Sequence, residues 1–166
     1  PTAQDTLDFT GPAINFGSRL LLLANRGKNS PLRPAPPPPP NPGEVHSAIR
    51  ELRAFGEGVL MVQVPKGFNR DEIQKVLSEH PVTKQYVLQV VVSEDVDIRD
   101  DRMALWGWFT RFDPYLDIHP ARRELAGNKL VMHFPLFIDA TWKEGYRLPV
   151  EFDPDIEQRV YDRWNE

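Results

Sequence analysis

The chain contains several nearly continuous runs of apolar residues, rich in Leu and Val. Such runs are typical of strands covered on both faces of a sheet. They predict three central strands, at 17–24, 59–64 and 85–92. Between these runs, apolar residues recur every three or four positions and predict helices at 44–55, 70–79 and 99–111. The alternation of strands and helices predicts βαβ units, and so one layered α/β domain with a mostly parallel sheet.

Local signals place some boundaries. Asn69 or Asp71 suits the N-cap of the 70–79 helix, and His80 ends it because a residue before proline disfavours helix. Asp153 followed by Pro154 predicts the start of a peripheral helix at 154–165. We expect one or two short strands at 129–138, interrupted by Pro135, and a loop at 113–123.

Seventeen prolines occur in the chain, and several cluster at 31–42, with an uninterrupted run at 36–40. Proline fixes φ and lacks an N–H, so this run favours a polyproline II spacer over a helix or central strand. It can be a ligand for an aromatic-lined groove in a partner, or a surface loop. We expect three parts, which are an extended N-terminal arm at 1–16, the α/β domain at 17–150 with its proline-rich loop at 31–42, and a C-terminal helix at 151–166.

Charge and composition exclude several classes of function. The chain carries 24 acidic and 20 basic residues and a net charge of −4, whereas nucleic-acid binding needs a basic face. It has no cysteine, which excludes disulfides and thiolate chemistry. No apolar run approaches the roughly 20 residues of a membrane span. We therefore expect a soluble, cytoplasmic protein that binds neither nucleic acid nor membrane.

An acidic run follows the third predicted strand, and its members are Glu94, Asp95, Asp97, Asp100 and Asp101. Ligands of parallel α/β sheets bind at the carboxyl ends of strands, and clustered carboxylates can hold Mg²⁺ or Mn²⁺. Asp95 and Asp97 are therefore weak candidates for metal ligands. The alternative is that acids at a helix N-terminus simply interact with the helix dipole. No glycine-rich phosphate-binding loop is present.

Two segments carry a resemblance to a known family. The helix that contains Trp106 ends in Thr-Arg-Phe-Asp-Pro at 110–114, and Gly-Asn-Lys-Leu at 127–130 precedes Ile-Asp-Ala-Thr-Trp-Lys at 138–143. This order resembles the C-terminal domain of the UbiD family of prenylated-FMN-dependent (de)carboxylases. The residues that we expect at an interface or lid are Trp106, Arg111, Asp113, Asp139 and Lys143. A simpler account is available, in which Arg111 ends a helix and Asp139 pairs with Lys143.

The resemblance implies a role within a larger lyase. Family enzymes use prenylated FMN with Mn²⁺ or Mg²⁺ and K⁺, and their catalytic and cofactor sites belong to the N-terminal domain. Nothing here matches the family's catalytic motif, so we assign no catalytic or cofactor-binding residue to this chain. We expect a small or C-terminal-domain subunit that assembles with and caps a larger flavin-carrying subunit, forming a hetero-oligomeric carboxy-lyase for an aromatic or unsaturated acid.

Two other functions remain open. The chain can be a self-contained metal-binding enzyme that uses the acidic cluster at 94–101. It can also be a non-enzymatic adaptor that binds a partner through the proline-rich loop. The pair of motifs at 90–117 and 127–143 favours the (de)carboxylase interpretation over both.

Overall fold

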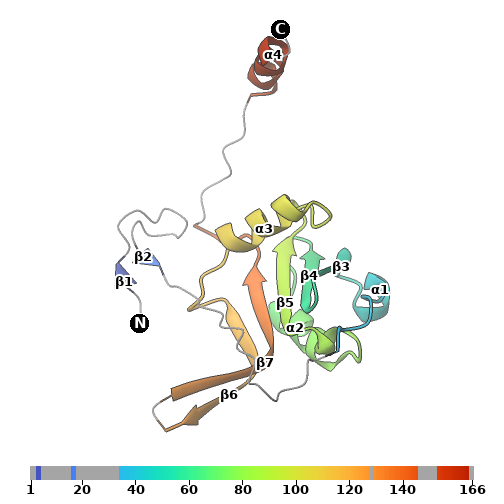
Figure 1. Ribbon diagram of the computed structural model, residues 1–166, viewed down its shortest axis with the longest axis vertical. Coiled ribbons are helices and arrows are strands. Elements are labelled where there is room, and N and C mark those ends of the chain that lie inside the picture. Colours follow the sequence, from blue (N-terminus) through green and yellow to red (C-terminus); the bar gives the residue numbers. More distant parts are fainter. Residues whose placement is uncertain (1–2, 5–15, 18–33, 128, 146–152, 165–166) are drawn as a thin grey trace.

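The computed structural model describes the chain except for residues 1–2, 5–15, 18–33, 128, 146–152 and 165–166, and its main sheet has five strands (Figure 1). Their order across the sheet is β3 (Glu51–Phe55), β4 (Val59–Val64), β5 (Leu88–Ser93), β7 (Lys129–Ala140) and β6 (Ile118–Ala126). The central three strands run parallel, and the outer two pair antiparallel with their neighbours. The predicted α/β class is confirmed, and the parallel part of the sheet is its centre.

Two helices cover opposite faces of this sheet. Side chains alternate across each strand, so β4 and β5 contribute to two separate cores. On one face α2 (Arg70–Glu79) packs Ile73 and Leu77 against Val62 and Val91. On the other face α3 (Asp101–Thr110) packs Ala104 and Trp108 against the strands. Most residues of β4 and β5 are therefore buried, as their apolar runs predict.

Capping explains why both helices begin where they do. The Asn69 side chain accepts a hydrogen bond from the Glu72 N–H at 3.3 Å, which confirms the predicted N-cap of α2. The Asp100 carboxylate accepts from the N–H groups of Arg102 and Met103 at the start of α3. The predicted helix at 70–79 is confirmed in both bounds, and His80 is its C-cap.

The helix predicted at 44–55 is wrong. The segment forms a four-residue helix, α1 (Pro42–Val45), and then strand β3, which pairs antiparallel with β4. Gly56 and Gly58 take positive φ values of 64° and 145°, so they build the tight hairpin turn between β3 and β4. The hydrogen bonds of this hairpin outweigh the helical spacing of apolar residues.

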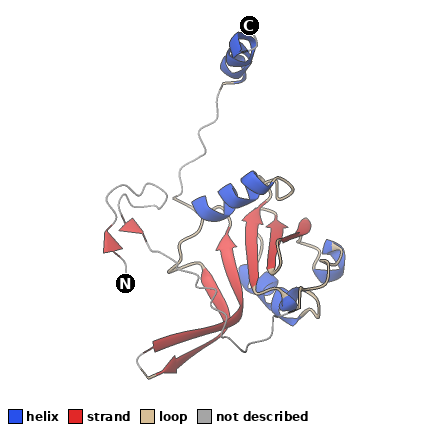
Figure 2. Cartoon of the chain, in the orientation of Figure 1, coloured by secondary structure: helices blue, strands red, loops and turns tan. Residues whose placement is uncertain are grey.

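The loop predicted at 113–123 is also wrong in its second half, where β6 begins at Ile118. β6 and the first half of β7 form a two-stranded arm that extends from the sheet (Figure 2). Pro135 does not interrupt β7, because it lies at the register shift between the two strands and before the pairing with β5 begins at Leu136. A ladder N–H is not required there.

The remaining elements are small or peripheral. A 3₁₀ turn, η1 (Thr83–Gln85), precedes β5, so that strand begins at Leu88, three residues later than predicted. The predicted strand at 17–24 falls largely outside the described residues, and so does most of the 1–16 arm, of which β1 (Ala3–Gln4) and β2 (Phe16–Gly17) pair antiparallel. The C-terminal helix is confirmed as α4 (Pro154–Trp164). No helix among the described residues is long and apolar enough to cross a bilayer.

Candidate functional site

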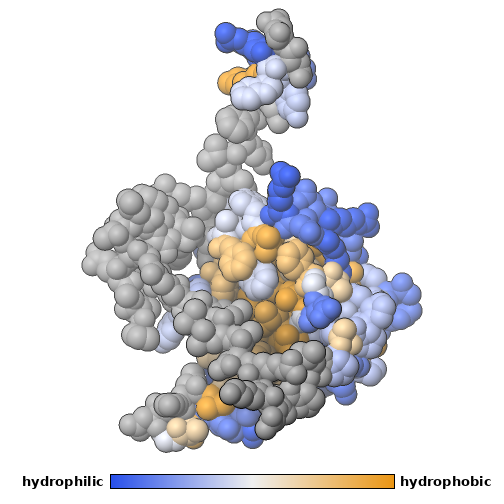
Figure 3. Space-filling view, viewed as in Figure 1, coloured by the Kyte–Doolittle hydropathy of each residue, from blue (hydrophilic) through white to orange (hydrophobic). Residues whose placement is uncertain are grey.

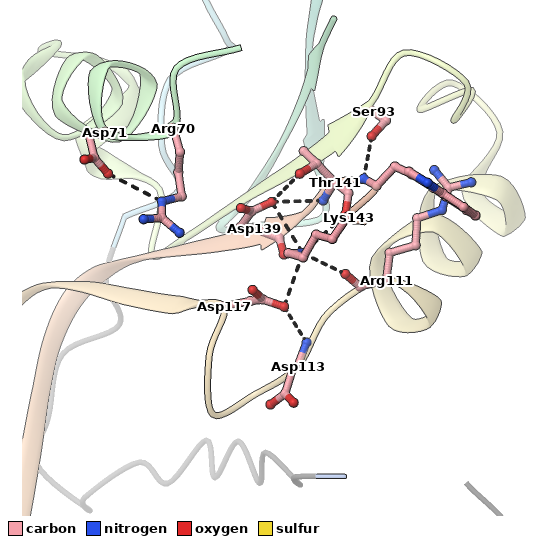
Figure 4. Close-up of polar contacts among 10 residues, drawn as sticks. Arg70, Asp71, Ser93, Arg111, Asp113, Asp117, Asp139, Thr141 and Lys143 are labelled. Carbon is pink, nitrogen blue, oxygen red and sulfur yellow. Dashed lines mark hydrogen bonds and ion pairs between the residues drawn. The ribbon is translucent and has the colours of Figure 1, made fainter. Parts of the chain in front are cut away.

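The two motif segments meet at the carboxyl ends of β5 and β7, which are adjacent parallel strands (Figure 4). Arg111 follows α3, and Asp139 lies at the end of β7. Because α3 leads from the end of β5 toward β6, residues about 30 positions apart in the chain become neighbours at this edge. A polar cluster forms there in two halves. The Arg111 side chain pairs with Asp95, and the Lys143 ammonium lies beside Asp117 and Asp139. The same ammonium binds the Arg111 carbonyl oxygen, which joins the two halves.

Arg111 is the buried centre of one half of the cluster, with a side chain that is 2% exposed. Its guanidinium donates two parallel hydrogen bonds to Asp95, from Nη1 to Oδ1 at 2.8 Å and from Nη2 to Oδ2 at 2.6 Å. The same group lies 4.9 Å from the ring centroid of Trp106 and 4.8 Å from that of Trp142. A planar guanidinium suits this arrangement, because it can pair with a carboxylate and contact aromatic faces at once.

Lys143 is the centre of the other half. Its ammonium donates to the carbonyl oxygens of Asp139 at 2.8 Å, Arg111 at 3.0 Å and Thr141 at 3.3 Å. It also lies 3.2 Å from Asp117 Oδ2 and 3.7 Å from Asp139 Oδ1. One lysine therefore joins the end of α3, the end of β7 and the start of β6.

The two buried carboxylates have further partners within the chain. Asp139 Oδ1 accepts hydrogen bonds from the Thr141 N–H at 3.0 Å and the Thr141 hydroxyl at 2.6 Å. Asp117 Oδ2 accepts from the Asp113 N–H at 2.7 Å, and Asp113 Oδ1 accepts from the Tyr115 N–H at 2.7 Å. These bonds fix the turn at 113–117 between α3 and β6.

The electrostatic environment differs between the two halves. Hydrogen bonding to Arg111 holds the pKa of Asp95 below its ordinary value. Burial raises the pKa of Asp117, although the Asp113 N–H and the Lys143 ammonium act in the opposite direction. Asp95 is therefore a firmly ionised partner, while Asp117 takes up a proton more readily than an exposed aspartate does.

Both weak metal candidates have partners within the chain. Both oxygens of Asp95 are engaged by Arg111, and one oxygen of Asp97, Oδ1, accepts from the Arg99 N–H at 2.8 Å. In the described part of the chain, no three His, Asp or Glu side chains gather as a metal site would require. Between Asp117 and Asp139, the position that a cation would take is occupied by the Lys143 ammonium. This cluster therefore does not suit a divalent metal.

All five residues expected at an interface or lid lie at this edge of the sheet. Trp106, Arg111, Asp139 and Lys143 contact one another or a shared partner, and Asp113 binds Asp117 through its backbone. Sequence reasoning missed Asp117, the partner role of Asp95, and Trp142. For Asp117, the available signal was its spacing from Asp113 around a proline turn.

An exposed apolar surface lies next to the cluster, over the outer side of α3 and the turn that follows (Figure 3). Its most exposed members are Phe109, Tyr115 and Leu116, at 58%, 70% and 62%. The other members, which are partly exposed, are Met103, Leu105 and Trp106. We call these six residues the α3 surface. A contiguous exposed apolar surface is typical of a site that contacts another molecule.

The chain is similar along its whole length to part of a group of chlamydial proteins. It is 31% identical to a subunit of the 4-hydroxybenzoate decarboxylase of Chlamydia pneumoniae, over 99% of this chain and 27% of that protein. It is 29% identical to an uncharacterized protein of Chlamydia muridarum over the same shares. The chain thus spans about a quarter of the length of the curated relatives it matches. No protein-family profile matches the chain.

Solved structures show the same fold. The closed form of the vanillic acid decarboxylase of Sedimentibacter hydroxybenzoicus matches with a TM-score of 0.52 and 18% identity, over 74% of this chain and 30% of that one. The UbiD-class enzyme HmfF from Pelotomaculum thermopropionicum, in complex with FMN, matches with a TM-score of 0.51 and 14% identity, over 72% and 30%. The domain has a UbiD-class fold. The resemblance predicted from the motifs at 110–114 and 138–143 is therefore confirmed, and residues of these two segments take part in the cluster.

Proposed function

We propose that this chain is the small or C-terminal-domain subunit of a UbiD-like (de)carboxylase, and that it assembles with and caps a larger flavin-carrying catalytic subunit. The enzyme acts on an aromatic or unsaturated acid and works in the cytoplasm. The observation that carries the proposal is the convergence of both UbiD motifs in one cluster that supports an exposed apolar surface.

The cluster supports a fastening role in this proposal. Its carboxylates and cations bind one another, so they hold segments of the chain together. Arg111 and Lys143 hold the end of α3 and the turn at 113–117 against the sheet. A surface held in this way is preorganised for a partner, because it loses little conformational entropy on binding.

The occupant that we propose for the α3 surface is the flavin-carrying subunit. The relatives extend well beyond the 27% that this chain matches, so this fold operates beside additional protein in them. The vanillic acid decarboxylase is known in open and closed forms, and HmfF binds prenylated FMN or FMN. We infer that this domain moves as a lid over a prenylated FMN, with Mn²⁺ or Mg²⁺ and K⁺, on the larger subunit. The flavin would supply the carboxyl-transfer chemistry, while this chain would enclose the site on the larger subunit.

The test is a native affinity purification of the chain from its source cells, with mass and flavin absorbance measured on the eluate. Wild type is expected to bring a larger, flavin-absorbing polypeptide. Phe109→Asp and Leu116→Asp place a charge in the α3 surface, and each should abolish this co-purification because burying an unpaired charge is costly.

Leu125→Asp is the matched control. Leu125 is 76% exposed but lies on the β6–β7 arm, away from the α3 surface. This variant should retain the larger polypeptide. A lone, colourless 19.1 kDa species from wild type would contradict the proposal. Retention by the α3 variants with loss in Leu125→Asp would instead move the contact to the arm.

A further inference from the structure

The proline-rich segment makes a specific contact with the chain's own domain. The Tyr86 hydroxyl donates a hydrogen bond to the Pro37 carbonyl at 2.7 Å, across 49 positions of sequence. Tyr86 is 2% exposed and belongs to the α2-side core. The contact therefore joins the segment to a fixed, buried aromatic residue.

Burial differs between neighbouring residues of the segment. Pro36 and Pro39, three residues apart, are half-buried, whereas Pro37 and Pro38 between them are exposed. Pro40 is half-buried as well, close to α1, which begins at Pro42. A polyproline II helix has three residues per turn, so every third residue lies on one edge. Asn41, at φ −62° and ψ 138°, has the same backbone conformation. One edge of a polyproline II helix thus faces the domain.

The receiving residue offers the donor that a polyproline II ligand needs. The carbonyl groups of polyproline II have no internal partner, and the Tyr86 hydroxyl donates to one of them. The Tyr86 ring belongs to the α2-side core, against which partly buried Val45 and Val82 also pack.

We propose that residues 36–41 are an intramolecular polyproline II ligand, held by the domain's own surface at Tyr86. The segment acts as a strap across the α2 side of the sheet. The α3 surface lies on the opposite face, so the strap leaves it uncovered. This interpretation replaces the open alternative of a ligand for a separate partner, and it does not depend on the proposed function.

The test frees the surface at Tyr86 and offers the ligand in trans. In the full chain, residues 36–40 are replaced by Gly-Ser-Gly-Ser-Gly, and a peptide with the sequence of residues 34–43 is titrated while the NMR signals of the Tyr86 ring are followed. The titration reaches several millimolar, because a short tether supplies an effective concentration of about that size. The opened variant is expected to bind the peptide, and wild type to show no binding because its own segment occupies the surface at Tyr86.

Two substituted peptides separate the edges of the helix. The Pro39→Ala peptide changes the docked edge and should bind more weakly, while the Pro38→Ala peptide changes the exposed edge and should bind like the unsubstituted one. Removing the hydroxyl with Tyr86→Phe in the opened variant should weaken binding about fivefold, the usual effect of one hydrogen bond, with the shift then followed on the ring of the introduced phenylalanine.

Three results would overturn the proposal. They are no binding to an opened variant that still unfolds cooperatively, equal binding to wild type, and equal binding of the two substituted peptides. If the opened variant does not fold, Pro39→Ala and Pro38→Ala are compared in the intact chain by urea unfolding. The docked-edge substitution must then lower the midpoint more than the exposed-edge one, and equal midpoints would refute the strap.

Discussion

Replacing Arg111 by Lys tests whether the buried guanidinium fastens α3 to the sheet. Lysine keeps the positive charge, but it can offer Asp95 only a single point contact and has no plane to lie between two rings. In wild type, both guanidinium amino groups bind Asp95, and the rings of Trp106 and Trp142 lie on the same group. The substitution therefore removes the paired hydrogen bonds and the ring contacts, while the positive charge is retained.

The magnitude follows from the contacts that are lost. One charge-assisted hydrogen bond contributes about 1.5–3 kcal/mol, and each cation–π contact contributes about 0.5–2 kcal/mol, part of which a lysine retains. The Asp95 side chain is 52% exposed, so solvent screens the pair and lowers the sum. We expect Arg111→Lys to lower the free energy of unfolding by about 2–3 kcal/mol.

The assay is urea unfolding of the chain, followed by circular dichroism and by tryptophan fluorescence. Arg99→Lys is the matched control, because Arg99 also pairs with a carboxylate, that of Glu51, but through Nε and with a side chain that is 78% exposed. Solvent screens this pair, so the substitution should cost much less than Arg111→Lys. Equal losses in the two variants would refute the fastening argument.

The ion pair between Arg111 and Asp95 also predicts how the stability lost in Arg111→Lys depends on pH. Arg111 lowers the folded-state pKa of Asp95 below its ordinary value of 3.8. A lowered carboxyl pKa contributes stability above the unfolded-state value, and this contribution disappears as the pH falls through the folded-state value. The difference between wild type and Arg111→Lys should therefore be full at pH 6 and shrink below about pH 4. A difference that is constant down to pH 2 would show that the ion pair is not its source.

Two further substitutions test the packing of α3 and the burial of a histidine. Gly107→Ala should destabilise the chain by about 1–2 kcal/mol despite the better helix propensity of alanine, because the new Cβ would lie 2.6 Å from Val96 Cγ1. Gly43→Ala is the control, since a Cβ there would have nothing within 4 Å. Equal urea midpoints for the two variants would contradict the clash. Burial lowers the pKa of His119, whose Nε2 has no hydrogen-bond partner among the described residues. Since the unfolded chain then binds more protons below about pH 6.5, stability should fall as the pH decreases through that value. His119→Phe should reduce this fall between pH 7.5 and 5.5, and an unchanged pH slope would show that His119 is not its cause.

Much of the central fold could be predicted because local and tertiary preferences agree there. The 59–64 strand is rich in Val and is buried between two helices, and the 70–79 helix has both an N-cap and a proline stop. At 51–55 the preferences disagree. The spacing of Leu52 and Phe55 fits a helix, but the turn at 56–58 allows the segment to pair with β4, and this pairing is visible only in three dimensions.

The β6 strand was missed for a related reason. Its sequence is mainly polar and contains Pro120, so it lacks the alternation that marks a half-buried strand. It forms because β7 offers a free edge, and an edge strand tolerates both proline and solvent exposure. Edge strands depend on their neighbours more than on their own sequence.

The candidate residues could be selected from motif order, but their partners required the sheet topology. Nothing local indicates that Asp95 binds Arg111, 16 residues later, or that Lys143 reaches Asp117. The parallel pairing of β5 with β7 decides both, since it brings two strand ends to one edge. The same topology places the Arg111 guanidinium on Asp95, one of the two residues that the sequence alone offers as metal ligands.

The carboxyl edge of a parallel sheet is where open α/β folds usually bind their ligands. In this domain the edge holds two cations of the chain itself, Arg111 and Lys143, and the neighbouring carboxylates bind them. A bound anion would have to displace Asp95, and a metal would have to displace an ammonium. This edge therefore serves to fix the end of α3 and the turn after it, and the apolar side chains that it fixes face outward. Under the proposed function, this fastening would hold the α3 surface ready for the partner subunit.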